Sequence, residues 1–381
     1  MAASQYSTVI DILADIPDPR KDRGKRHPWW LILLLLVLGL LQGEETPYGI
    51  GMWVQANAEQ LMEALQPARG YLPSFSTLYR ALQTMDIESV KHRLGLCENG
   101  QASSVLQGVA LDGKSIRGVW KFGEKVHLLS LVRHEPPVIL AQVAVGEKEN
   151  EISAAPALLA EVDLRHKVVT ADALLTQREL CEQIRKQKGD YLLAVKDNHP
   201  RMKEAIAYLF DNPPWTESER AVEYQRYSTT DKGHGRIERR TLEASTSLNN
   251  YLDWPGLQQV MKRTVRRTIV KTGEASESVT YGITSLPPEK ADARTLERLW
   301  RGHWAIENRV HYVRDVSMGE DAGRSHRGNT PVVLAFLRNL VLSFLRLTGW
   351  DSIPNAFRYY RARLRESLQL LGHPPTRTDG L

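Results

Sequence analysis

The sequence predicts a mixed α/β protein in which a helical N-terminal region precedes a region built on a β-sheet. Three observations support this fold class. Apolar residues recur at helical spacing up to about residue 100, residues 105–198 alternate between strand and helix patterns, and residues 220–286 show the two-residue alternation of strands. The 381 residues, 42% hydrophobic and 25% charged, are typical of a globular chain of two or three domains.

The first strong element is an apolar helix at residues 29–41, WWLILLLLVLGLL. Thirteen residues are fewer than the ~20 that a helix needs to cross a bilayer. Glu44 and Glu45 lie three and four residues after Leu41 and end the apolar run. We therefore predict a buried core helix, with a membrane anchor as the rival interpretation.

Two further helical patterns occupy residues 49–65 and 73–94. Ser76 is predicted to cap the second helix. One face of that helix carries Leu78, Leu82 and Met85. We predict a helical N-terminal domain over residues 1–100, and its short helices suit either a DNA-binding module or a packing domain.

From residue 105 to 198 the elements follow the order βββαβαβ. The predicted strands are 105–112, 127–134, 137–146, 167–172 and 190–198, and the predicted helices are 151–162 and 176–189. Three consecutive strands before the first helix indicate a mixed sheet in which the first and fourth strands can be neighbours.

The remaining elements extend this sheet region to about residue 350. Residues 215–288 are predicted to be a β-rich insertion with basic residues on outward positions, and residues 291–313 return to helix. Residues 331–347 form an apolar helix that we assign to the core because it contains Arg338, Asn339 and Arg346. We predict domain limits of 101–350 for this region and a basic C-terminal tail at 351–381.

Three acids are placed where they could hold metal ions. Asp112 closes the first strand and Asp172 closes the fourth, so both would emerge at one edge of the sheet. Glu307 is the best third candidate, in a helix expected to pack on that edge. Three carboxylates around two divalent ions support phosphoryl transfer. With 45 acids in the chain, this spacing alone is a weak signal.

The chain resembles the DDE transposases of bacterial insertion sequences, most closely the ISAs1 family with its H-repeat-associated proteins. The matching segments occur in the family's order and cover nearly the whole chain. They are IPDPRKDRGKRHPWWLILLLLVLGLLQG, VALDGKSIRG, TADALLTQRELCEQI, YLLAVKDNHP, GHGRIERR and HWAIENRVHYVRDVSMGEDAGR.

This resemblance implies an RNase H-like catalytic domain and a triad of Asp112, Asp172 and Glu307. It implies DNA cleavage and strand transfer that depend on Mg²⁺, with Mn²⁺ as a substitute. The partners would be terminal inverted repeats and target DNA. Cutting two ends together favours a homodimer or higher oligomer on DNA, in the cytoplasm at the nucleoid and without a membrane.

The wider IS4-like group carries the signature Tyr-x2-Arg-x3-Glu-x6-Lys, and this chain departs from it. Aligned on Glu307, this chain has Trp300, His303 and Arg314 at the other positions. Trp300 keeps an aromatic ring and Arg314 keeps the charge, whereas His303 replaces the arginine. We expect His303 and Arg314 to contact DNA.

Basic and polar residues near the acids are further candidates for DNA contacts. Lys114 and Arg117 follow Asp112 and could hold a phosphate, or form a solvated turn. Lys196 and Asn198 follow the fifth strand beside the same edge. His234 lies between two glycines, which permit close approach of a DNA backbone or simply make a hairpin turn.

The β-rich insertion is strongly basic, although the net charge of the whole chain is only +5. A positive surface supplies sequence-independent affinity for DNA. The basic residues are Arg236, Arg239, Arg240, Lys262, Arg263, Arg266, Arg267 and Lys271. Among these, we expect Arg236, Arg239, Arg266 and Arg267 to bind DNA.

Glu320 and Asp321 form a second acidic pair, predicted to be structural or to pair with Arg324 and Arg327. Two alternative functions remain. The chain could be a catalytically silent, transposase-derived DNA-binding protein, or an RNase H-like nuclease that selects DNA structure.

Overall fold

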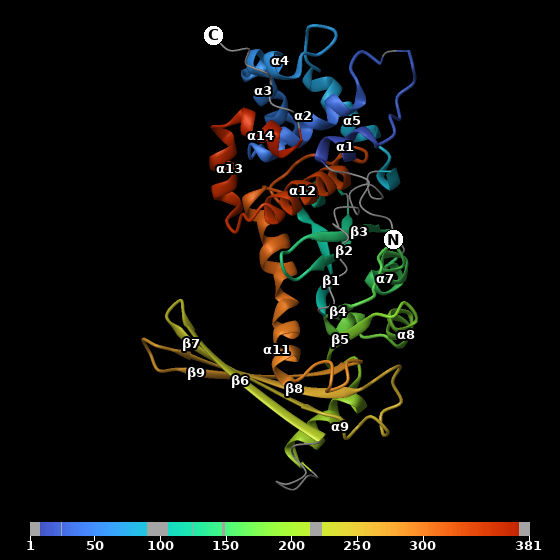
Figure 1. The fold of residues 1–381 in the computed structure, drawn as a ribbon, viewed down its shortest axis with the longest axis vertical. Helices are drawn as coiled ribbons and strands as arrows, with labels where there is room; N and C mark the ends of the chain where they lie inside the picture. Colours follow the sequence, from blue (N-terminus) through green and yellow to red (C-terminus); the bar gives the residue numbers. More distant parts are fainter. Residues whose placement is uncertain are drawn as a thin grey trace.

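The protein is elongated, with a central sheet between a helical layer and an antiparallel β-ribbon (Figure 1). This computed structural model describes residues 8–23, 25–89, 106–123, 125–146, 149–213 and 223–372. Helices of the N- and C-terminal regions gather at one end, and the ribbon lies at the other. The mixed α/β fold class predicted from the sequence is confirmed.

One nine-stranded sheet runs through the molecule in the order β3-β2-β1-β4-β5-β9-β8-β7-β6. β1 pairs parallel with β4 and antiparallel with β2, so the predicted adjacency of the first and fourth strands is correct. The strands are β1 (Gln107–Ile116), β2 (Val126–Arg133), β3 (Ile139–Val145), β4 (Lys167–Ala171), β5 (Asp190–Val195), β6 (Tyr224–Gly233), β7 (Arg236–Ser245), β8 (Gln259–Ile269) and β9 (Ala275–Thr284).

Alternating side chains of β1 enter different cores on the two faces of the sheet. Val109 and Leu111 pack with helices α7 (Glu151–Ala160), α8 (Arg178–Lys186) and α9 (Pro200–Asp211). Ala110 and Ile116 pack on the opposite face with the N-terminal helices and α12 (Thr330–Leu347). The helical N-terminal region therefore shares a core with the sheet.

Among the described residues, five helices with defined bounds build the N-terminal layer. They are α1 (Val9–Ala14), α2 (Trp29–Leu41), α3 (Pro47–Ala56), α4 (Ala58–Leu65) and α5 (Phe75–Thr84). Every residue of α2 except Trp30 is buried, which confirms the predicted core helix. Asn57 separates α3 from α4, and Ser74 rather than Ser76 precedes α5, so the predicted cap was wrong. Leu78, Leu82 and Met85 are all buried as predicted.

α12 is the one helix in the described ranges that is long and apolar enough to cross a membrane, and 89% of its 18-residue window is buried inside the protein. It packs against α2, α5 and β3, as expected for a core helix. The region predicted as a basic tail forms α13 (Ile353–Arg361) and α14 (Leu364–Leu370), which pack against α2. Gln42 donates a 2.8 Å hydrogen bond to the Ser367 hydroxyl across this contact.

The predicted β-rich insertion continues the central sheet, because β9 pairs antiparallel with β5. α11 (Ala293–Gly302) crosses β6 and β7 and runs alongside the sheet toward the helical layer (Figure 1). The Glu297 carboxylate anchors it through two bonds from Arg263, at 2.8 and 2.9 Å. Two π-helical segments follow, η3 (Ile306–His311) and η4 (Val313–Ser317).

Candidate active site

The three candidate acids come from β1, from the end of β4 and from η3. Leu111 pairs with Ala171 in the parallel β1–β4 ladder, so Asp112 and Asp172 follow at the same edge of the sheet. Asp172 begins the short 3₁₀ turn η2 (Ala173–Leu175). Glu307 lies in the π-helical segment, which contacts β1. π-Helical turns occur often at functional sites.

Asp112 is the electrostatic centre of this group. Burial, followed by the negative charges of Glu151, Glu307 and Asp172, raises the pKa of Asp112 to about 7. A hydrogen bond from the Gly113 amide partly opposes this shift. The raised pKa follows because ionising Asp112 places another negative charge among acids in a poorly solvated position.

Each acid has a different neighbour. Lys196 forms a 2.7 Å ion pair with Asp172, and Trp304 donates its indole N–H to Glu307 Oε2 at 2.8 Å. Burial raises the pKa of Asp172, but the hydrogen bond and charge of Lys196 outweigh it and leave that pKa below its usual value. Asp112 has His311 beside it, with the imidazole Nδ1 lying 3.6 Å from Asp112 Oδ2.

His311 does not neutralise Asp112. Burial and the charges of Arg314 and Lys114 lower the pKa of His311 to about 3, so its imidazole is neutral at neutral pH. Its Nε2 is buried and has no hydrogen-bond partner among the residues that the structure describes. Asp112 is thus a largely buried carboxyl group for which the described part of the chain supplies no ion-paired cation.

The donor chemistry at this edge fits a hard divalent cation. Carboxylate oxygens are the ligands that Mg²⁺ prefers, and a cation would offset the repulsion among the acids. Within the described ranges, no three His, Cys, Asp or Glu side chains are close enough together to form a ready-made metal cage. The fit therefore rests on the uncompensated charge of Asp112 and on the type of the surrounding donors.

A fourth acid, Glu151 at the first position of α7, was not predicted from the sequence. Its charge has the largest influence of any side chain on Asp112. Its Oε1 lies 2.8 Å from His127 Nε2. Gly113 allows this approach, because a β-carbon there would collide with the Glu151 carboxylate. Glu151 lies at the start of a helix, and no pattern in the sequence predicts that this position contacts β1.

A buried polar chain links the sheet to α11 beneath the acids. Thr170 Oγ1 lies 3.0 Å from His134 Nε2 and 3.1 Å from His303 Nδ1. Burial lowers the pKa of His134 to about 3 and that of His303 to about 4, so both rings are neutral. His303 thus bonds to β4, and this contact differs from the DNA contact that we predicted for it. Gly302 leaves room for the His134 ring.

Lys114 and Arg314 lie in a buried ionic cluster rather than on a DNA-facing surface. The Lys114 ammonium pairs with Asp315 at 2.6 Å, Glu320 at 3.2 Å and Asp321 at 3.5 Å. Arg314 is completely buried and donates to both oxygens of Glu320 at 2.7 Å. In this conformation neither cation is available to a phosphate.

Glu320 is the centre of that cluster. Burial would raise its pKa, but Arg314, Arg338 and Lys114 lower the pKa of Glu320 to about 2. Arg338 also donates to the Glu45 carbonyl at 2.8 Å and so connects the cluster to the N-terminal helices. Glu320 is structural as predicted, but its partners are these residues rather than Arg324 and Arg327.

The remaining candidates near the acids are exposed. Arg117 faces solvent, and its backbone N–H donates to Asp321 Oδ1 at 3.0 Å. Asn198 donates to the Ala173 carbonyl at 2.6 Å and so holds the turn that follows Asp172. His234 has φ of +48° in the β6–β7 hairpin turn. Its predicted DNA contact stays a prediction.

The four arginines predicted to bind DNA from the insertion divide into two pairs. Arg239 and Arg266 lie directly opposite each other on β7 and β8, are exposed, and make no ion pair or hydrogen bond within the described ranges. Arg236 and Arg267 instead pair with Glu238, at 2.9 and 3.2 Å. Arg266 also lies opposite Glu277 of β9, whereas Arg239 lies opposite Thr230 and Arg266. Like charges opposite each other destabilise a sheet unless an anion offsets them, which favours Arg239, with Arg266 beside it, as the anion-binding pair.

Comparisons with known proteins cover almost the whole chain. Residues 103–344 match the family described as Transposase DDE domain, and residues 10–95 match the family described as DDE_Tnp_1-associated. "Putative transposase YncI" of Escherichia coli O157:H7 is 29% identical over 349 residues, which are 89% of this chain and 87% of the relative. "H repeat-associated putative transposase YhhI" of Escherichia coli K12 is 27% identical over 359 residues, covering 90% and 91% of the two chains.

Proposed function

This chain belongs to the DDE transposases, and from that premise we propose that it cleaves DNA at element ends and joins the freed 3′-hydroxyl to target DNA. Asp112, Asp172 and Glu307 would be the catalytic acids. Terminal inverted repeats would be the first substrate and target DNA the second. A reaction at two ends would require a dimer or a higher oligomer on DNA.

One observation carries the assignment of the acids. The charges of Glu307 and Asp172 both act on Asp112, although the three residues lie 60 and 135 positions apart along the chain in sequence order. Perturbed carboxyl groups of this kind gather at functional sites. The charge of Glu151 also raises the pKa of Asp112, so Glu151 would adjust the charge around the proposed triad.

The three acids would hold divalent ions, Mg²⁺ or Mn²⁺. When bound, such ions lower the pKa of an attacking water or hydroxyl and stabilise the leaving oxygen. The protein's own side chains would position the acids. Trp304 holds Glu307 through its indole N–H, and Lys196 holds Asp172. Neutral His303 fixes the segment before Glu307 to β4 through Thr170.

A cleavage and joining assay tests this proposal. The substrate is labelled duplex DNA with the ends that flank the gene, incubated with Mg²⁺ or with EDTA. We expect Mg²⁺-dependent nicking at the ends and a joined product from the wild type, and neither from Glu307→Gln. Glu289→Gln, an exposed acid in the turn before α11, is the matched control and should behave as wild type.

Two other outcomes would replace this function. Binding to the ends without cutting in Mg²⁺ or Mn²⁺ would indicate a transposase-derived DNA-binding protein. Cutting that ignores the end sequence and yields no joined product would indicate a nuclease. Either result would contradict the strand-transfer proposal.

A further inference from the structure

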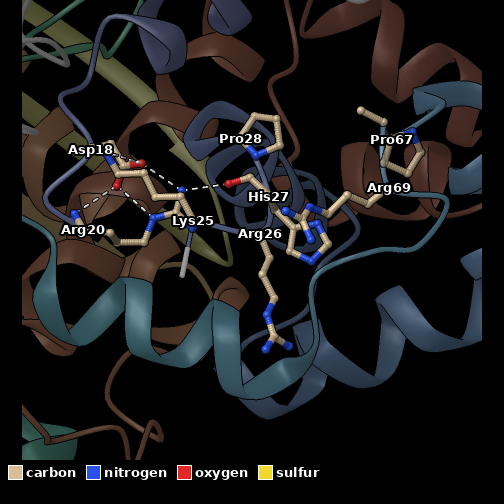
Figure 2. Close-up of a pocket in the computed structure, with 9 residues that line it drawn as sticks. Asp18, Arg20, Lys25, Arg26, His27, Pro28, Pro67 and Arg69 are labelled. Atoms are coloured by element: carbon tan, nitrogen blue, oxygen red, sulfur yellow. Dashed lines mark hydrogen bonds and ion pairs between the residues drawn. The ribbon is translucent and has the colours of Figure 1, made fainter. Parts of the chain in front are cut away.

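A basic pocket of about 260 Å³ lies at the start of α2, in the N-terminal layer. Arg20, Lys25, Arg26, His27 and Arg69 contribute to its lining, with Asp18 as the one acid. Figure 2 shows Arg69 extending from the loop after α4 toward His27, opposite the side where Asp18 and Arg20 lie. Asp18, Arg20, residues 25–28 and residues 67–69 are thereby brought together around one small space.

Two of the cations that line this pocket already form ion pairs with acids of the protein. Arg20 binds Asp18 through two 2.8 Å hydrogen bonds, donates to the His27 carbonyl at 2.8 Å, and stacks 5.1 Å from the Trp29 ring centre. Lys25 pairs with Asp22 at 3.0 Å. These contacts fix the wall of the pocket and offset the charge of Asp18.

The other two cations are free. Arg26 and Arg69 form no hydrogen bond or ion pair with any residue that the structure describes, although both line the pocket. A guanidinium group offers paired N–H donors that match the oxygens of a phosphate. Two such groups beside one cavity leave an excess of positive charge that only an anion from outside can offset.

His27 supplies an independent sign of a ligand. Only 6% of the residue is exposed, and within the described ranges its ring makes no hydrogen bond, only an edge contact with Tyr71 at 5.0 Å. Burial and the charges of Arg69, Arg20 and Arg26 lower the pKa of His27, so a positive field converges on this point. A neutral imidazole retains one N–H donor for an anion.

The first turn of α2 adds to this field. Its N-cap residue is Pro28, which offers no side-chain acceptor for the first amide groups. Pro28 lines the pocket, so the positive end of a 13-residue helix dipole faces the same region. Free amide groups and the dipole at a helix start favour phosphate groups.

We propose that this pocket binds a phosphate group, held by Arg26, Arg69 and the His27 ring. Its source would be the backbone of the DNA on which the protein acts, so the inference rests on the proposed function and adds one defined contact to it. The cavity is below the size range of sites for drug-sized ligands and suits one charged group. The helical layer would thus grip DNA at a site separate from the catalytic acids.

The test measures DNA binding in EDTA, where cleavage does not contribute. Fluorescence anisotropy with the flanking-end duplex compares wild type, Arg26→Gln/Arg69→Gln and a matched control, Lys186→Gln/Lys188→Gln, which removes the same charge from exposed positions at the end of α8. We expect roughly tenfold weaker binding for the pocket variant and little change for the control. The slope of log affinity against log salt should fall by about 0.9 for one lost phosphate contact.

Ethylation interference then locates the contact. A single phosphate whose ethylation weakens wild-type binding should stop mattering in the pocket variant, while the other contacts remain. A neutral methylphosphonate at that position must weaken binding of the wild-type protein, so the proposal stays testable even if the variant folds poorly.

Two results separate the remaining possibilities. If DNA binding is unchanged but calorimetry shows that inorganic phosphate or ATP binds the wild type and not the variant, the phosphate comes from a small molecule. If neither DNA nor these probes distinguishes the variant from the control, the proposal is overturned. Neither result alters the comparison of Glu307→Gln with wild type, which tests the proposed function.

Discussion

At the scale of single residues, Asp112 combines a buried position with neighbours of its own charge. In the unfolded chain its pKa would be near 3.8, whereas in the folded protein it is about 7. The folded state therefore binds this proton more tightly. The resulting stability is complete below pH 4 and is lost as the pH rises through 7.

Asp112→Asn is expected to be more stable than the wild type at pH 8 in EDTA. The difference should grow from pH 4 to pH 8 by up to about 4 kcal/mol, the equivalent of the roughly three-unit rise in pKa. Urea unfolding at several pH values measures it. A difference that is constant with pH would show that Asp112 is ionised normally, and Glu289→Gln serves as the control without a buried charge.

Thr170 is a second residue whose substitution should lower the free energy of unfolding by a predictable amount. Thr170→Val keeps the side-chain shape but removes the hydroxyl that contacts both His134 and His303. We expect a loss of about 2 kcal/mol in the free energy of unfolding, because two buried imidazoles lose a partner. Thr170→Ser keeps the hydroxyl and should recover most of the loss, and equal effects from both variants would argue against the hydrogen-bonded chain.

At the scale of elements, the β7–β8 hairpin has two faces with different roles. On one face Glu238 offsets Arg236 and Arg267. On the other, Arg239 faces Arg266, and Arg266 also lies opposite Glu277 of β9, although within the described residues neither arginine forms an ion pair. The alternation of a strand separates these faces, since successive side chains point in opposite directions. Equal numbers of arginines can therefore be removed from either face.

Arg239→Gln/Arg266→Gln should weaken DNA binding and lower the salt slope by up to about 1.8, because each lost phosphate contact contributes about 0.9. Arg236→Gln/Arg267→Gln removes the same charge from residues that Glu238 already binds, so its slope should stay close to that of the wild type. Anisotropy titrations between about 50 and about 300 mM salt, a sixfold range of concentration, provide the comparison. Equal slopes for the two variants would show that only total charge matters.

Element positions were largely predictable from the sequence, whereas long-range partners were not. The βββαβαβ order and the neighbouring positions of β1 and β4 follow from patterns within each segment and from connection rules. Lys114 looked like a surface residue beside Asp112, yet its partner Asp315 lies 201 positions further along the chain. No local pattern encodes that pairing. The pairing of β9 with β5, and the packing of the C-terminal helices on α2, depend on similar contacts.

At the scale of the whole molecule, one buried acid connects three regions. Glu320 binds Arg314 of η4, Lys114 of β1 and Arg338 of α12. Arg338 in turn donates a hydrogen bond to the carbonyl of Glu45, in the segment that follows α2. The N-terminal helices and one face of the sheet also share a single apolar core. These regions should therefore unfold together.

Glu320→Gln is expected to lower the free energy of unfolding by roughly 3–5 kcal/mol, because it leaves buried cations without their main partner. Tryptophan fluorescence and far-UV circular dichroism should still report one coincident urea transition, shifted to lower concentration. Two separated transitions in the wild type would contradict a shared core. Glu289→Gln should leave the midpoint unchanged.

Because the sheet is continuous, it also sets the distance between the candidate acids and the arginines of the β-ribbon. Neighbouring strands lie ~4.8 Å apart, so the four steps from β4 through β5, β9 and β8 to β7 span about 19 Å across the strands. The register places Ala171 level with Ser245, so Arg239 also lies about five residues, or roughly 17 Å, further along β7 than Asp172. The two components combine to about 25 Å, which corresponds to about seven base pairs of duplex at ~3.4 Å each. The hydrogen bonds between the strands make the sheet a rigid spacer, so it would keep the distance between the candidate acids and Arg239 constant. If Arg239 and Arg266 bind phosphates as we propose, those phosphates would lie at a constant distance from the bond that is cut, whatever the base sequence between them.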